Sequence, residues 1–299
     1  MRYVSPAWLF NGHLPDHPDS KTLRLRRTQL LADLELSGAT TIEYHGEVLT
    51  KNDIILLFDE LEKENTLAWH QAVAKDRTLL AFLEDIHFDD WAVQQHCVRY
   101  LENPLYEDTA FIKWLSPNYY DSFMFYMEIN CLKASNGHAL VALLSVPLLM
   151  TPADEEKAWQ ATSQLIEKPI ARILRYAAKA SSEAELARTS AWMEEGFLQL
   201  VHLLPEQHFG PVRDKYALAI FEACSNVHRK SQKYLHLTPL WMENAIRLAV
   251  SPAVKNQLEQ SRKKMFSPGG RIQKLRDIPL RIWITILAVL ILCYWLGHK

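Results

Sequence analysis

The sequence is poor in the residues and motifs on which many enzymes depend. It has nine glycines, which leaves little material for phosphate-binding loops. No HExxH, GxSxG, Walker or GxGxxG pattern occurs in it. We therefore expect no cofactor, and a non-enzymatic role is favoured over an enzymatic one. No resemblance to a known family covers a substantial part of the chain.

Cysteine is also scarce. The four cysteines are far apart in the chain, and none is in a CxxC pair. This spacing excludes a disulfide framework and is typical of a reducing compartment. The first residues contain no apolar run of useful length, so no signal peptide is expected. The cysteines and the N-terminal residues together predict that most of the chain lies in the cytoplasm.

Charge of either sign is missing from one stretch, Ile282 to Leu296. As a helix this run would be ~22 Å long, and ~28 Å if it began at Ile278, which is close to the ~30 Å hydrocarbon core of a bilayer. Aromatic residues near both ends are typical of a membrane interface. The sequence predicts a single transmembrane anchor over 278–296, with these residues facing lipid: Ile282, Trp283, Leu287, Leu290, Tyr294 and Trp295.

Basic residues are concentrated just before this run. From Lys255 onward there are nine Lys or Arg and two acidic residues, whereas the preceding part holds 24 basic and 33 acidic residues. An acidic body makes a nucleic acid partner unlikely, because such partners need a basic face. Cations collect on the cytoplasmic side of a span and attract anionic headgroups. The residues predicted to bind headgroups are Arg271, Lys274, Arg276 and Arg281.

Helical patterns dominate the rest of the chain. We predict an all-α body over 1–265 with about ten helices and one short β-hairpin near residues 41–50. The body has room for two subdomains, with a boundary near 103–150. A basic linker over 266–277 would join it to the anchor. Proline positions divide other segments: 111–132 is predicted as two short helices, and a new helix is expected to begin at Pro169.

Two side-chain clusters are weak candidates for chemistry. Asp85, His87 and Asp89 lie in a short acidic segment with oxygen ligands that hard cations prefer, but the same segment fits a helix connection. Arg229 and His236 have the Arg-x6-His spacing of HEPN ribonucleases, and this resemblance implies an all-α nuclease in which the pair acts on a phosphate. A basic surface turn explains the same residues. We therefore assign no metal site and no catalytic residue.

The anchor and the helical body together predict a non-enzymatic scaffold or adaptor. It would be a single-pass membrane protein, in the inner membrane if bacterial, with membrane lipid and a protein as partners. A secretion or injection machine would suit such a design. The alternatives are a membrane-tethered hydrolase, HEPN-like at best, and a membrane-disrupting oligomer. The sequence does not decide the oligomeric state.

Overall fold

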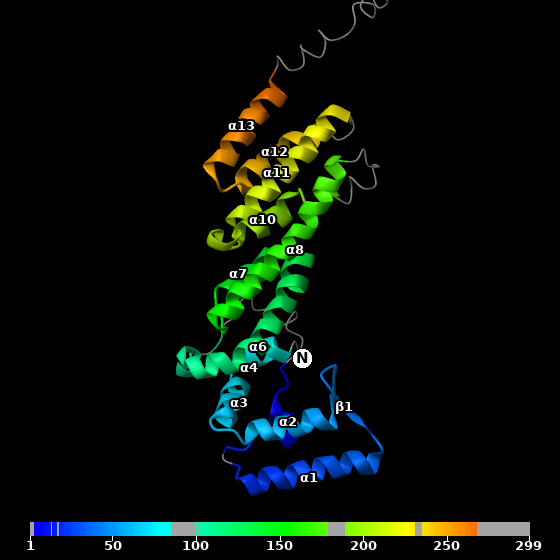
Figure 1. The fold of residues 1–299 in the computed structure, drawn as a ribbon, viewed down its shortest axis with the longest axis vertical. Helices are drawn as coiled ribbons and strands as arrows, with labels where there is room; N and C mark the ends of the chain where they lie inside the picture. The colour runs from blue at the N-terminus through cyan, green and yellow to red at the C-terminus, as the bar shows by residue number, and fades with distance from the viewer. Residues whose placement is uncertain are drawn as a thin grey trace, which may run out of the picture. The chain divides into compact units, whose positions relative to one another are not determined.

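The computed structural model describes most of the chain before the predicted anchor (Figure 1). Within the described part there are eleven α-helices and one two-stranded antiparallel sheet, which confirms the all-α class. The contacts divide the chain into an N-terminal unit, 1–166, and a C-terminal unit, 167–299. This division falls later than the 103–150 region named from the sequence. The described residues are 3–12, 14–16, 18–84, 100, 102–178, 189–230 and 235–267.

The N-terminal unit holds the hairpin and most of the shorter helices. Its elements are η1 (Pro6–Phe10), α1 (Ser20–Ser37), β1 (Thr41–Tyr44), β2 (Glu47–Thr50), α2 (Lys51–Leu61), α3 (Thr66–Lys75), α4 (Arg77–Glu84), η2 (Pro104–Glu107), α6 (Thr109–Tyr126), η3 (Met127–Lys133), α7 (Gly137–Leu144) and the first part of α8 (Pro152–Ala178).

Local sequence signals account for the first elements of this unit. Asp19 caps α1 by accepting a hydrogen bond from the backbone of Thr22. The hairpin turns at His45 and Gly46, whose φ angles of 48° and 80° match the primed turns that join antiparallel strands. Thr50 and Asp53 form a reciprocal capping box that begins α2 directly after β2. The hairpin predicted near 41–50 is confirmed.

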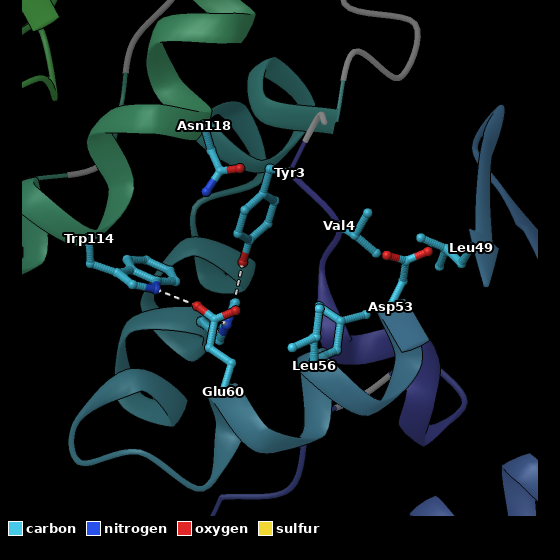
Figure 2. Close-up of a pocket in the computed structure, with 10 residues that line it drawn as sticks. Tyr3, Val4, Leu49, Asp53, Leu56, Glu60, Trp114 and Asn118 are labelled. Carbon is cyan, nitrogen blue, oxygen red and sulfur yellow. Dashed lines mark hydrogen bonds and ion pairs between the residues drawn. The ribbon is translucent and has the colours of Figure 1, made fainter. Parts of the chain in front are cut away.

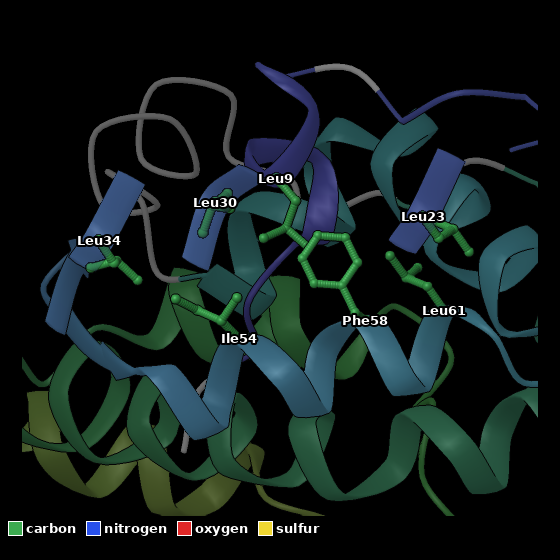
Figure 3. Close-up of a cluster of buried hydrophobic side chains, with 7 residues drawn as sticks. All are labelled: Leu9, Leu23, Leu30, Leu34, Ile54, Phe58 and Leu61. Atoms are coloured by element: carbon green, nitrogen blue, oxygen red, sulfur yellow. The ribbon is translucent and has the colours of Figure 1, made fainter. Parts of the chain in front are cut away.

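A hydrophobic cluster fixes α1 against α2, with η1 inserted between them (Figure 3). Five of its seven residues lie three or four positions from another member in the same helix, so that one face of each helix is apolar. Burial of each large aliphatic or aromatic side chain contributes ~1.5–3 kcal/mol. The members are Leu9 from η1, Leu23, Leu30 and Leu34 from α1, and Ile54, Phe58 and Leu61 from α2.

The prediction of two short helices over 111–132 is wrong. One α-helix, α6, runs through Pro117 and continues as the π-helix η3. An internal proline costs ~3 kcal/mol because it removes a backbone donor and crowds the preceding turn. Burial of four large side chains at four-residue spacing on one face of α6 outweighs that cost. These side chains belong to Phe111, Leu115, Tyr119 and Phe123.

The prediction that a new helix begins at Pro169 is also wrong, because α8 is continuous through that residue. The run Thr151-Pro152-Ala153-Asp154 predicts the start of α8, and Thr151 and Asp154 exchange hydrogen bonds there. Three isoleucines flank Pro169 and are buried, and their burial offsets the cost of the missing donor: Ile166 before it, and Ile170 and Ile173 after it.

The C-terminal unit is built around α12, which packs against α10, α11 and α13 (Figure 1). Trp241 of α12 is among the largest fully buried side chains. Ser251 caps α13, as its Ser-Pro start predicts. Besides the remainder of α8, the described elements are α10 (Glu195–Leu203), α11 (Glu206–Lys230), η4 (Leu235–Leu237), α12 (Thr238–Leu248) and α13 (Pro252–Phe266).

The sequence also predicts one helix over 182–204, whereas the described helix α10 begins at Glu195. Residues 191–194 form a turn before α10. Side chains from other helices bind the carbonyls of this turn: Tyr216 donates to the Trp192 carbonyl, and Asn244 donates to the Met193 carbonyl. These bonds offer the backbone an alternative to helix formation.

Among the described residues, no helix is both long enough and apolar enough to cross a membrane. The predicted anchor over 278–296 and all but the first two residues of the predicted linker over 266–277 lie outside the described residues. The anchor therefore stays a prediction.

Candidate functional site

A cavity of about 170 Å³ lies in the N-terminal unit, where the first residues of the chain pass between α2, α3 and α6 (Figure 2). By comparable measures a cavity needs roughly 10–15 Å³ to hold one water, so this one can accept a group the size of a side chain. Leucine and valine side chains make up much of its wall. Its polar or aromatic lining residues are Tyr3, Asp53, Glu60, His70, Trp114 and Asn118.

Four of these side chains form a connected polar cluster. The Tyr3 hydroxyl lies 2.7 Å from Nδ1 of His70, and Nε1 of Trp114 donates to Oε1 of Glu60 at 2.6 Å. Nε2 of His70 is 3.8 Å from the same Glu60 oxygen and has no hydrogen-bond partner among the described residues. His70 is 2% exposed, so this ring nitrogen is a buried polar atom with an unmet hydrogen bond.

Each member of the cluster is positioned by a different element. The capping box fixes where α2 begins and thereby sets the position of Glu60 in its last turn. His70 lies on the buried face of α3 together with Thr66 and Val73, at positions i, i+4 and i+7. The backbone of Ser5 donates to Glu84 of α4 at 2.9 Å, which holds the N-terminal segment and Tyr3 in place.

Burial keeps the imidazole neutral. It lowers the pKa of His70 from 6.5 to about 3, because a charged ring would lose its hydration. Burial also raises the pKa of Tyr3, and the nearby carboxylates of Glu84 and Glu60 add to that rise. Hydrogen bonds from Thr50 lower the pKa of Asp53, so its carboxylate at the cavity edge is charged. The site therefore carries negative charge and a neutral imidazole.

His70 should make stability fall with acidification. Its folded pKa lies below the unfolded value, so the unfolded chain binds a proton first, and stability is lost as the pH falls below about 6.5. In mild detergent, the free energy of unfolding of the full chain should fall by about 2 kcal/mol more than that of His70→Gln between pH 7.5 and pH 5. Urea unfolding of both chains at each pH measures this difference. Equal pH slopes for the two chains would contradict the assignment.

A second polar cluster lies beside the first. Glu84 of α4 accepts hydrogen bonds from the backbone of Ser5 and from the hydroxyl of Tyr44, at 2.9 and 3.2 Å. Burial raises the pKa of Glu84, and these hydrogen bonds oppose the rise. Trp8 stacks on Tyr44 with ring centroids 5.6 Å apart. This cluster joins the hairpin, α4 and the N-terminal segment.

The C-terminal unit has a hollow of about 470 Å³ along α10 and α12. Leu198, Leu203 and Leu248 line it. Its histidine, His202, accepts at Nδ1 from the buried Arg213 guanidinium at 2.7 Å. Burial and the Arg213 charge both lower the pKa of His202.

Most residues predicted to carry chemistry lie outside the described residues. This holds for Asp85, His87 and Asp89, for the headgroup residues Arg271, Lys274, Arg276 and Arg281, and for the anchor residues. Arg229 belongs to the last turn of α11, but its side chain is not among those described, and His236 is exposed in η4. The described structure therefore does not test whether the side chains of Arg229 and His236 lie together.

Within the described residues, no group of three or more His, Cys, Asp or Glu side chains could hold a metal ion. Cys131 and Cys224 are buried, and burial raises the pKa of each thiol to about 12. A thiol nucleophile needs a lowered pKa, so these two cysteines are unsuited to that role.

Sequence reasoning missed the cluster around His70. Its contacts join residues 67 and 54 positions apart, which periodicity cannot reveal. The position of His70 on the apolar stripe of α3 was the one available signal that it is buried. Comparison with protein-family models, with curated proteins and with solved structures finds no match for this chain.

Proposed function

We propose that the chain is a non-enzymatic scaffold, held in a membrane by residues 278–296, whose helical body docks a protein partner on the cytoplasmic side. The observation that carries this proposal is the uncharged run from Ile282 to Leu296 with basic residues before it. The basic segment begins on α13, where Arg262, Lys263 and Lys264 are exposed. Such cations contribute ~1 kcal/mol each near an anionic surface.

The site chemistry favours docking over catalysis. A general base works best with a pKa near the working pH, whereas the pKa of His70 is displaced to about 3. The Tyr3 hydroxyl is within hydrogen-bonding distance of His70, and Trp114 donates to Glu60, so much of the polar lining serves to hold α2, α3, α6 and the N-terminal segment together.

Cross-linking in native membranes tests this function. A photoreactive residue in place of Leu56, which is 63% exposed at the cavity, should form an adduct with one protein partner. A chain that yields no protein adduct from this position or from other exposed positions of the body is not a docking protein.

A further inference from the structure

Two polar atoms at the cavity of the N-terminal unit have no hydrogen-bond partner among the described residues, one of them buried and one on a partly exposed side chain. Nε2 of His70 is buried with no partner among the described residues. Oε1 of Glu60 accepts from Trp114, while the second carboxylate oxygen makes no hydrogen bond or ion pair in the described part of the chain. Figure 2 shows Glu60 and the Trp114 indole directed toward the same space below Tyr3.

The charged residues that line the cavity determine whether it favours a cation or an anion. Among the described residues, no lysine or arginine lines it, whereas Asp53 and Glu60 do. In the described part of the chain, the one basic side chain paired with Glu60 is His70, which is neutral at physiological pH because burial lowers its pKa to about 3. A partly buried carboxylate without a cation favours a positively charged guest.

The donor pattern narrows this guest to a primary ammonium group. An ammonium has three donors and no acceptor, so it can bind both a carboxylate oxygen and a ring nitrogen. The Tyr3 hydroxyl can donate to Nδ1 of His70 or accept from it. When it accepts, the lone pair of the imidazole is at Nε2, next to Glu60.

The rest of the lining fits an aliphatic stem. Val4, Leu49, Leu56 and Leu57 form the apolar part of the wall. A lysine side chain buries its four-carbon stem along such surfaces and keeps its charge at the tip. Phosphatidylethanolamine also carries an ammonium, but its phosphate lies close to that group, where Asp53 and Glu60 would repel it.

We propose that this cavity binds the ammonium group of a lysine side chain presented by the protein partner, with Glu60 and Nε2 of His70 as its acceptors. The inference rests on the proposed docking function and names the chemistry by which the partner is recognised.

Nα-acetyl-lysine methylamide is the probe, added to the full chain in mild detergent. Histidine-selective nitrogen NMR reports on Nε2 of His70, whose signal is identified by its loss in His70→Gln. We expect a saturable shift of this signal with the probe and none with the Nε-acetylated analogue, which lacks the charge. Glu60→Gln keeps an acceptor for Trp114 and should weaken binding at least tenfold. Glu64→Gln removes the same charge at an exposed position nearby and should leave binding unchanged.

In a second titration, glycerophosphoethanolamine replaces the lysine probe and represents the headgroup of phosphatidylethanolamine. Binding of this compound as tightly as the lysine probe would overturn the proposal in favour of a headgroup. Failure of both compounds to shift the His70 signal would mean that the cavity holds water alone. In either case, a partner adduct at position 56 that persists in Glu60→Gln would show that docking stands while lysine recognition fails.

Discussion

Removal of residues 268–299 is expected to transfer the protein from the membrane fraction to the soluble fraction. The uncharged run supplies the hydrophobic span, and no helix among the described residues can replace it. A chain ending at Ser267 keeps all of α13, including Phe266, whose ring lies 5.7 Å from that of His228. Sedimentation after an alkaline wash measures the partition.

A double substitution provides the matched comparison for this truncation. Leu287→Arg with Leu290→Arg keeps the length of the chain but places two charges in the predicted span, each costing ~2.5–3.5 kcal/mol at the centre of a membrane helix. The double variant should leave the membrane as the truncated chain does. Full-length protein found in the supernatant without detergent would contradict the anchor, as would a truncated chain that still sediments with membranes.

Trp241→Ala is expected to destabilise the C-terminal unit by about 3–5 kcal/mol, the usual cost of removing a large aromatic side chain from a core. Trp241 is 1% exposed on α12, which packs against α10, α11 and α13. Hydrogen exchange of the amides in α11 and α12 gives the free energy of opening before and after the substitution.

A substitution at the neighbouring Leu240 distinguishes the loss of core packing from a change in helix propensity. Leu240 is in the same helix but 48% exposed, so Leu240→Ala should change the free energy of opening by less than about 0.5 kcal/mol. Equal effects at positions 240 and 241 would mean that α12 is not the centre of this unit.

Local signals predicted where several elements begin. The Thr50 and Asp53 capping box, the turn at His45 and Gly46, and the Ser251 cap each depend on residues within a few positions of one another. The chemistry of a cap or turn is local, and sequence alone can therefore identify it.

Sequence reasoning failed where distant packing decides the structure. Pro117 and Pro169 were interpreted as breaks, but burial of apolar side chains on both sides keeps each helix continuous. Glu60 and His70 were not recognised as a site, because α2, α3 and the N-terminal segment must pack before their side chains meet Tyr3 and Trp114. The apolar spacing through each proline is visible in the chain, but packing decides whether its burial outweighs the proline, and the contact of Glu60 with His70 leaves no periodic trace.

Cross-linking from position 56 in native membranes tests the central claim most directly, because Leu56 is at the cavity and its side chain is exposed. The account predicts one protein adduct that is strongly reduced in Glu60→Gln and retained in Glu64→Gln. The absence of any protein adduct, or an adduct with lipid alone, would contradict the view that this chain is a membrane-held docking protein.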